Sequence, residues 1–254
     1  MLPAERKRKI VELVSAQDGC SVQELADHFG FSKATVRRDL QQLEDDGMIE
    51  RSHGGAVPVT TVGREQTYGQ REVQNLEEKM AIAARAVEEI VEGQVVCFDS
   101  GTTTMEVAKQ TPKDGSVLTV TNSPLLALEL GKDENEVKLT GGTLRERTRA
   151  LVGPSAERFM ERMNFDLLFL GTNAVDVEAG LTTPNEDEAR IKEQMVGCAE
   201  TVVLCADSTK LGDRSFVQFA TLDDVDVFVT DAELTDEQRE AFYAAGVRLV
   251  TEVA

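Results

Sequence analysis

The chain has no tryptophan, 2 histidines and 4 cysteines in 254 residues. No two cysteines are spaced as C-x-x-C, which argues against a zinc knuckle or a redox pair, and most of the thiols are expected to be buried and inert. No apolar run approaches the roughly 20 residues that a membrane helix needs, and no apolar segment of signal-peptide length follows the N-terminus. We therefore expect a cytoplasmic protein with no membrane partner, no metal and no cofactor.

Positive charge is also scarce. Lys and Arg number 27 against 46 Asp and Glu, for a net charge of −19, and only 10 of the cations are lysines. An acidic, lysine-poor surface is typical of proteins from very salty cytoplasm, so a halophilic source is expected; an ordinary acidic cytoplasmic protein is the alternative. Residues 1–60 hold 8 cations and 10 anions (net −2), whereas the remainder holds 19 and 36 (net −17). The N-terminal fifth is thus nearly neutral and the rest is strongly acidic.

The first 60 residues contain three amphipathic patterns followed by a hairpin pattern. Apolar spacing predicts helices over 4–16, from Ser21 to Gly30, and over 32–46. Ser21 with Glu24 has the spacing of a capping box. The stretch "MIERSHGGAV" has short β-type pieces on both sides of a Gly-Gly turn. This order predicts a winged helix-turn-helix domain over residues 1–57, and residues 58–75 are expected to form a linker.

The third predicted helix, which begins "SKATVRRDL", separates cations from apolar residues. Val36, Leu40 and Leu43 share one face, while Lys33 and Arg37 share another. A helix with cations near its start suits the major groove, where Arg and Lys reach guanine edges or phosphates; an ordinary solvated helix face is the alternative. Asp39 is expected to hold a neighbouring cation in place. The residues expected to contact DNA are Ser32, Lys33, Thr35, Arg37, Arg38, Arg51 and His53.

From Leu76 onward, short apolar runs alternate with helical patterns. The expected strands are "QVVCFD", "VLTVT", "VKLT", "FDLLFL", "TVVLCAD", "DVFVTD" and "VRLVT". Helices are expected over 77–91, 103–110, 124–131, 155–163, 185–199 and 235–245. Such alternation predicts an α/β domain over 76–254, with a mostly parallel sheet and helices on both faces.

The stretch "FDSGTTTMEVA" combines a strand end with small hydroxyl residues and a helix start. The strand ends at Asp99, Gly101 allows a close backbone approach, and Thr102 and Thr103 offer N–H and O–H donors. A phosphate is favoured at such a helix N-terminus, because open α/β sheets bind ligands where their strands end. A simple helix cap is the alternative.

Three further stretches carry candidate ligand residues: "TNSP", "GTNAVD" to "TTPNEDEARIK", and "ADSTKLG". The candidates are Asn122, Asp176, Glu188, Lys192, Asp207 and Lys210. Taken by itself, Asn122 is better explained by helix capping. Glu188 and Lys192, four residues apart, are as well explained by a helical salt bridge, and Lys210 by an exposed loop position.

The stretches "RKRKIVELV", "VQELADHF" and "SKATVRRDLQQLEDDGMIERSHGGA" resemble the N-terminal signature of DeoR-type transcriptional regulators. The resemblance extends over residues 76–250, where the family's sensor domain is similar in fold to ribose-5-phosphate isomerase. It implies a sequence-specific repressor that binds double-stranded operator DNA as a homodimer or homotetramer. It also implies a phosphorylated sugar as effector, held by Asp99, Gly101, Thr102, Thr103, Asn122, Asp176, Glu188, Lys192 and Lys210. "GGTLRERTRALVG" stands where such sensors have a Gly-Gly pair and a conformational loop.

A sugar-phosphate isomerase fused to a DNA-binding domain is the alternative function. An isomerase needs a carboxylate base near the sugar and an electrophile for its carbonyl. The isomerase's Gly-rich Lys loop has no clear counterpart, and "GTNAVD" departs from its Asp-rich motif. The sequence therefore favours a regulator over an enzyme.

Overall fold

The computed structural model describes residues 3–17, 19–45, 48–52, 54–57, 65–133 and 135–253. Residues 1–74 and 75–254 form two compact units, called below the N-terminal unit and the C-terminal unit. Each unit has its own apolar core. Within the described ranges, no helix has both the length and the apolar character needed to cross a bilayer. The expected boundaries at residues 57 and 75 stay a prediction.

The N-terminal unit contains four helices and a small antiparallel sheet among its described residues. Its elements are α1 (Pro3–Ala16), β1 (Cys20–Ser21), α2 (Val22–Phe29), α3 (Lys33–Asp45), β2 (Glu50–Ser52), β3 (Gly55–Val57) and α4 (Tyr68–Val73). The Ser21 side chain accepts from Glu24 N and the Glu24 side chain accepts from Ser21 N, so the predicted capping box is present. Gly30 ends α2 in the left-handed conformation, at φ 70°. The predicted winged helix-turn-helix order is confirmed.

The sheet of this unit depends on one glycine. β3 lies between β1 and β2 and pairs antiparallel with both. A Cβ added at Gly55 would lie 2.2 Å from the carbonyl oxygen of Cys20 on the paired strand β1, so only glycine fits at this position of β3. The helix α4 lies inside the range expected to be a linker, where "TYGQREV" begins with a second capping box between Thr67 and Gln70.

The C-terminal unit is built on a seven-stranded sheet, and all its strand pairs are parallel. The strand order is β15-β14-β12-β9-β4-β5-β6. The bounds are β4 Val95–Phe98, β5 Leu118–Thr121, β6 Val137–Leu139, β9 Leu167–Leu170, β12 Val202–Cys205, β14 Val227–Val229 and β15 Arg248–Val250. Each strand coincides with one of the seven apolar runs, so the predicted parallel α/β fold is confirmed.

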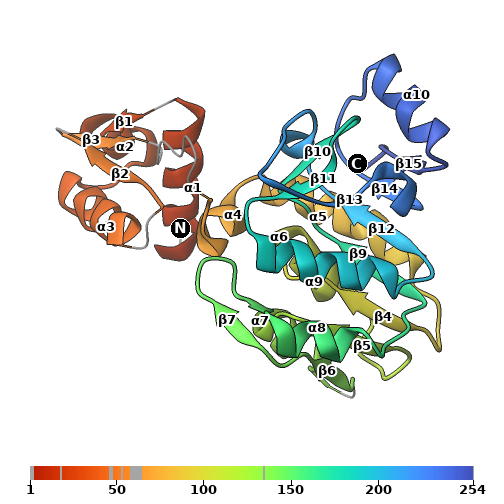
Figure 1. Cartoon of the computed structure of the whole chain (residues 1–254). Coiled ribbons are helices and arrows are strands. Elements are labelled where there is room, and N and C mark those ends of the chain that lie inside the picture. Colours follow the sequence, from red (N-terminus) through yellow and green to blue (C-terminus); the bar gives the residue numbers. More distant parts are fainter. Residues whose placement is uncertain are drawn as a thin grey trace. The chain divides into compact units, whose positions relative to one another are not determined.

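Helices cover both faces of this sheet (Figure 1). One face packs on α5 (Leu76–Ala86), α6 (Thr102–Gln110) and α7 (Pro124–Leu130). The opposite face packs on α8 (Pro154–Met160), α9 (Glu186–Gly197) and α10 (Asp236–Ala244). Alternate residues of one strand enter different cores, as Phe98 and Cys97 of β4 do. Continuous apolar strands result, because both faces are covered.

Two small antiparallel sheets and three 3₁₀ turns complete the unit. The strands are β7 (Thr143–Arg145) with β8 (Ala150–Val152), and β10 (Ala174–Asp176) with β11 (Gly180–Thr183) and β13 (Val217–Ala220). The 3₁₀ turns are η1 (Val87–Glu89), η2 (Ser208–Lys210) and η3 (Leu222–Asp224). The sequence analysis did not predict these strands. Polar side chains cluster where the parallel strands end, and that edge is described next.

Candidate functional site

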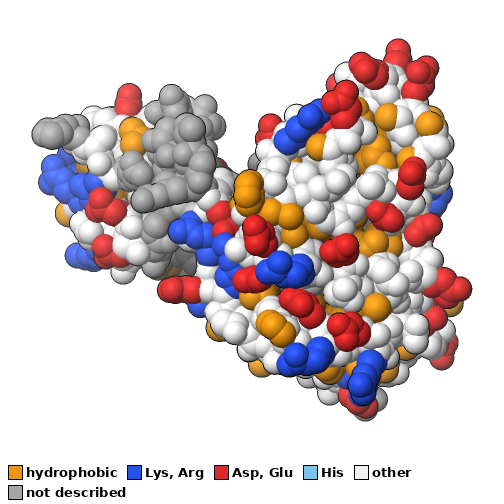
Figure 2. Space-filling model, viewed as in Figure 1, with side chains coloured by type: hydrophobic (Ala, Val, Ile, Leu, Met, Phe, Trp, Pro, Cys, Tyr) orange, Lys and Arg blue, Asp and Glu red, His pale blue; other side chains and the backbone are white. Residues whose placement is uncertain are grey.

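The outer face of α3 presents three cations. Lys33, Arg37 and Arg38 are exposed, while Val36 and Leu40 of the same helix are fully buried. Among the described residues, none of the three cations forms an ion pair. Figure 2 shows cationic side chains on the side of the N-terminal unit to which α3 belongs. The face is therefore free to meet an anionic partner.

The start of α3 is held by two of the residues expected to contact DNA. The Ser32 hydroxyl accepts a hydrogen bond from Thr35 N at 3.2 Å and lies 2.9 Å from the Thr35 hydroxyl. Ser32 thus caps the helix, and the Thr35 hydroxyl contacts this cap, while both side chains remain at or near the surface. Arg51 is half-buried and lies on β2, the strand that follows α3 along the chain. His53, the other hairpin residue expected at DNA, lies outside the described residues.

Asp39 holds a cation, but the cation comes from α1. Arg6 donates from Nε to Asp39 Oδ2 at 2.6 Å and from Nη2 to Asp39 Oδ1 at 3.0 Å. Asp39 is 3% exposed, so this pair lies on the inner side of α3. A two-point contact fixes the rotation of α3 about its axis, because both guanidinium bonds must be kept. The free cations of α3 therefore face outward.

In the C-terminal unit, polar residues follow neighbouring parallel strands at one edge of the sheet. The residues that directly follow β6, β5, β4 and β9 are Thr140, Asn122, Asp99 and Gly171, and Asp207 lies two residues after the end of the next strand, β12. Their side chains, where present, are at most 3% exposed. Parallel strands bring their carboxyl ends to the same edge, which is where open α/β sheets bind ligands.

Asp99 is the centre of this edge. One of its oxygens, Oδ2, accepts from Lys192 Nζ and from Gly171 N at 3.1 Å. Lys192 also donates to the carbonyl of Gly171 at 2.9 Å. The other oxygen, Oδ1, is buried and has no hydrogen-bond partner among the described residues. Burial raises the pKa of Asp99, and Lys192 and Gly171 N only partly offset this effect.

The loop after Asp99 forms the N-terminus of α6. Gly101 is the N-cap residue and has no side chain to accept from the first N–H groups of the helix. Thr102 and Thr103 are 7% and 8% exposed. Asn122 supports this loop from β5, because its Oδ1 accepts from Ser100 N at 3.0 Å. The backbone donors at the start of α6 and a positive helix end therefore meet at the same edge as Asp99.

Glu188 and Lys192 do not pair with each other. Glu188 accepts from the Thr148 hydroxyl and from Arg145 Nη1 at 3.0 Å, whereas Lys192 binds Asp99. Glu188 is 4% exposed and acts on Asp99 as a nearby like charge that raises its pKa. Helix α9 thus carries two buried charges with opposite signs to the edge of the sheet. The alternative of a simple helical salt bridge does not apply.

Asp207 forms a second buried carboxylate group of this edge. Its Oδ1 accepts from Thr209 N at 3.1 Å and from Asn75 Nδ2 at 3.1 Å, while Oδ2 is buried without a partner among the described residues. Burial raises the pKa of Asp207, but the positive charge of Lys210 and the Thr209 hydroxyl outweigh burial, and the pKa lies below its usual range. Lys79 adds to this effect.

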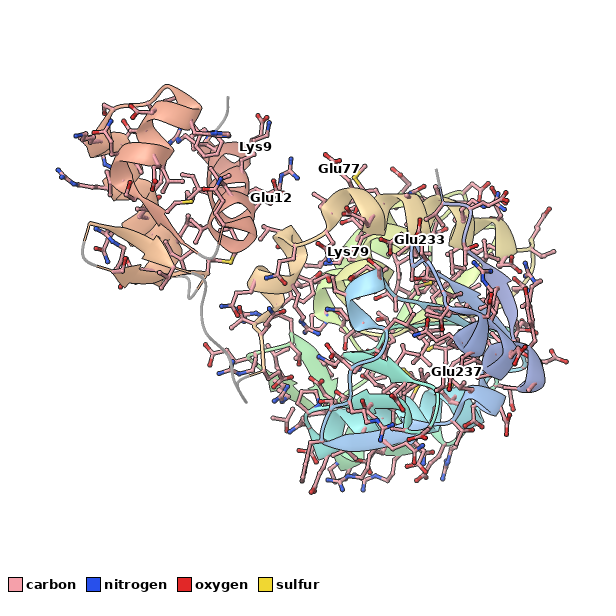
Figure 3. The ribbon with its side chains drawn as sticks, turned by 90° about the horizontal axis from the view of Figure 1, so that it is seen from above. Lys9, Glu12, Glu77, Lys79, Glu233 and Glu237 are labelled. Carbon is pink, nitrogen blue, oxygen red and sulfur yellow. The ribbon has the colours of Figure 1, made fainter. Side chains whose placement is uncertain are left out.

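Lys79 and Asn75 are site residues that the sequence analysis missed. Figure 3 shows Lys79 among the side chains of the C-terminal unit, while Glu77 on the same helix lies at its outer rim. Lys79 is 3% exposed, which is unusual for lysine and marks a charged partner nearby. In the sequence, Lys79 is a single cation in the helical stretch "LEEKMAIAA". The spacing of apolar residues along this helix does not distinguish a buried lysine from an exposed one.

Asp176 lies apart in its contacts. It accepts from Glu178 N and Ala179 N in the β10–β11 turn and pairs with Arg214 at 2.8 Å. Burial raises its pKa, but these donors outweigh burial and lower it below the usual range. The described contacts of Asp176 therefore explain it as a turn residue, and no contact joins it to Asp99 or Asp207.

Comparisons with known proteins agree with both halves of this description. Residues 6–62 match the DeoR-like helix-turn-helix domain, and residues 74–232 match the DeoR C terminal sensor domain. The chain is 72% identical over 254 residues to the HTH-type transcriptional regulator GlpR of Haloferax volcanii, covering 100% of both proteins. That source fits the halophilic protein predicted from composition.

A second relative comes from Escherichia coli K12. The chain is 32% identical over 234 residues to its glycerol-3-phosphate regulon repressor, covering 91% of this chain and 92% of that protein. Among solved structures, ribose 5-phosphate isomerase A of Methanocaldococcus jannaschii has a TM-score of 0.40 at 16% identity, covering 54% of this chain and 55% of that one. This structural likeness is too low to carry an argument.

The two family matches and the named relatives all indicate the same class of protein, a transcriptional regulator. They span the cationic α3 in the N-terminal unit and the buried polar edge of the C-terminal unit. The prediction of a regulator rather than an enzyme is confirmed. The chain belongs to the DeoR family of transcriptional regulators.

Proposed function

We propose that the protein is a cytoplasmic, sequence-specific DNA-binding repressor of genes for glycerol or sugar catabolism. A phosphorylated polyol or sugar bound in the C-terminal unit releases it from DNA. The names of two relatives, a GlpR regulator and a glycerol-3-phosphate regulon repressor, support this class of target and effector. The observation that carries the proposal is the pair of buried carboxylates, Asp99 and Asp207, each with one unpartnered oxygen at the strand ends.

The DNA-binding half uses the outer face of α3. Arg37 and Lys33 read base edges in the major groove, and Arg38 and Arg51 contact the backbone. Ser32 and Thr35 bring a hydroxyl pair and the start of a helix to a phosphate. His53 belongs to the same proposed contact set. A homodimer or homotetramer would present two such helices to a palindromic operator. The domain limits proposed for this half are residues 1–57, with a linker to residue 75.

In the effector-binding half, the phosphate group and the hydroxyl groups of the ligand bind at different places, because the local charges differ. The phosphate binds the N–H groups at the start of α6, near Thr102 and Thr103, because the carboxylates would repel it elsewhere. The hydroxyl end lies at Asp99 and Asp207, whose free oxygens can only accept hydrogen bonds when ionised. The other proposed effector residues are Gly101, Asn122, Glu188, Lys192 and Lys210. Asp176 is left out of this set, because its described contacts hold it in the β10–β11 turn.

The test measures DNA affinity as effector is added. A fluorescent DNA fragment selected by this protein from a random pool is titrated in molar KCl, by anisotropy, with glycerol 3-phosphate or sugar phosphates. We expect a phosphorylated compound to weaken DNA binding, and unphosphorylated glycerol to have no effect. By linkage, DNA weakens effector binding by the same factor. If no phosphorylated polyol or sugar changes DNA affinity, the proposed effector class is wrong.

A matched pair of threonine variants locates the effector. Thr102→Val removes one hydroxyl at the start of α6 and should weaken the effector response by roughly tenfold while leaving DNA affinity unchanged. Thr201→Val is the control, because Thr201 precedes β12 at the opposite edge of the sheet. If both variants weaken the effector response equally, the proposed phosphate position at the start of α6 is wrong.

A further inference from the structure

One surface of the C-terminal unit combines exposed leucines with paired lysines. Eight large apolar side chains are exposed in the described part of the chain, and four of them are leucines within residues 125–144. Leu125 and Leu128 lie on α7, at 36% and 76% exposure, and Leu139 lies on β6 at 39%. The helix α7 packs against β5 and β6, so these three side chains belong to one region. We call it the α7–β6 surface.

The lysines of the C-terminal unit are concentrated around the same surface. Lys79 and Lys192 are buried, and Lys210 lies at the effector edge. The other four are all near α7 and β6, and each is within 4 Å of a glutamate. These pairs are Lys109–Glu106, Lys113–Glu129, Lys132–Glu129 and Lys138–Glu136. Four of the seven lysines of the C-terminal unit therefore lie around one edge of the sheet.

This arrangement makes the α7–β6 surface nearly neutral in a strongly acidic domain. Figure 2 shows cationic beside acidic side chains along the lower rim, where Figure 1 places β6. Two copies of a chain with net charge −19 repel each other over most of their surfaces. The repulsion is reduced where lysines balance glutamates, and exposed leucines supply apolar area at the same place.

The strand β6 adds an open edge to this surface. It is the last strand in the order, so one row of its backbone N–H and C=O groups has no strand neighbour within the described ranges. An open edge is a template for a further strand or a close contact with another chain. Lys138, in the middle of β6, limits unspecific pairing, because a charged side chain on an edge strand disfavours addition of another strand.

We propose that the α7–β6 surface is where a second copy of this chain binds, in a two-fold symmetric contact. A two-fold contact requires a surface that complements itself, and a patch with lysines and glutamates in near balance does so. The leucines of α7 form its apolar centre and the ion pairs its polar rim, as in other protein interfaces. The inference rests on the proposed function, which includes an even-numbered assembly, and it locates the contact of that assembly away from α3 and the effector edge.

The first test is the molar mass of the full chain in molar KCl, by light scattering after size exclusion. Wild type is expected at the mass of an even-numbered assembly. Leu128→Asp should weaken the contact by more than about 100-fold, since two copies each lose a buried leucine. Phe216→Asp is the matched control, because Phe216 is 78% exposed and precedes β13, which belongs to a different sheet from β6, so this variant should leave the mass unchanged.

A second variant keeps the test independent of the leucines. Lys132→Glu with Lys138→Glu turns the neutral rim acidic, so the assembly should dissociate and partly recover as KCl is raised. Circular dichroism checks that each variant is folded. A wild type with the mass of one chain, an unchanged mass for Leu128→Asp, or equal dissociation by Phe216→Asp overturns the proposal. None of these results affects the test of the effector.

Discussion

The two units place their charged groups in opposite ways. The N-terminal unit keeps Lys33, Arg37 and Arg38 exposed, and its buried Asp39 is satisfied by two bonds from Arg6. The C-terminal unit instead collects buried charges where its strands end, and two of its carboxylates each keep one oxygen that has no hydrogen-bond partner in the described part of the chain. A large anionic partner is met by cations that stay in water, whereas a small ligand is met by groups already removed from water.

This difference has a cost in stability that falls on one unit only. Burying a charge costs free energy of desolvation unless the charge is paired and hydrogen-bonded. A buried oxygen without a partner leaves part of this cost uncompensated by contacts within the protein. Exposed cations carry no such penalty. The C-terminal unit should therefore respond strongly to changes at its polar edge, while the N-terminal unit should lose DNA binding without losing stability.

The largest effect is expected from Lys192→Met. The substitution leaves Asp99 buried without its cation and should lower the free energy of unfolding by about 3–5 kcal/mol. Urea unfolding in molar KCl measures it. Arg85→Met, which breaks the exposed Arg85–Glu88 pair, is the control and should cost less than about 1 kcal/mol. If both variants lose the same stability, the comparison between buried and exposed charge fails.

The next effect is expected from Arg37→Ala. Removing a base-reading arginine should weaken DNA binding by about 1–3 kcal/mol, while unfolding by urea stays as in wild type. Anisotropy with the selected DNA fragment measures the affinity. Arg85→Ala serves as the control for loss of a surface cation. Unaltered affinity would remove Arg37 from the proposed contacts.

A smaller effect of opposite sign is expected from Thr140→Val. The Thr140 hydroxyl is buried after β6 and has no hydrogen-bond partner among the described residues. Replacing it by a methyl group of similar shape should raise the free energy of unfolding by about 1 kcal/mol in the absence of effector. Thr111→Val, which removes a hydroxyl that donates to Val107 O at 2.9 Å, should lower it. Destabilisation by Thr140→Val would show that the hydroxyl is satisfied.

The smallest effect should appear only in acid, through Asp207. Its pKa in the folded protein lies below the usual range, so the folded state holds the proton less tightly than the unfolded chain. The stability that this carboxylate contributes is present above the unfolded pKa of about 3.9 and is lost as pH falls through the lower folded pKa. Stability of Asp207→Asn should depend less on pH in that window. Parallel pH curves for the two proteins would contradict this.

The sequence predicted the parallel sheet because its strands are buried on both faces. Runs such as "VVCF" and "LLFL" have no polar alternation and are bounded by turn residues, so their number and positions could be inferred. The antiparallel strands β10 and β11 could not, since three or four mixed residues such as "AVD" and "GLTT" carry too little pattern. Helix α4 was hidden in the same way, because six residues are too few for a period.

The sequence predicted which loops carry the candidate site, but not which charged side chains in it pair with each other. Strand ends point to Asp99 and Asp207, because the topology brings the carboxyl ends together. Spacing along α9 suggested that Glu188 and Lys192 bind each other, yet Lys192 reaches Asp99, 93 residues away, and Glu188 reaches Arg145. Contacts across such separations depend on how the helix packs on the sheet, which local sequence does not encode. Lys79 was missed for that reason.

The bidentate pair between Arg6 and Asp39 has a consequence for how this regulator can evolve. It fixes the orientation of α3 from the inner side, so the outward residues Lys33, Arg37 and Arg38 are not needed to hold the helix in place. Within the described part of the chain they make no ion pair, and exchanging them carries little folding penalty. If these three side chains read the operator as proposed, new operator sequences can be explored by changing them on an unchanged scaffold.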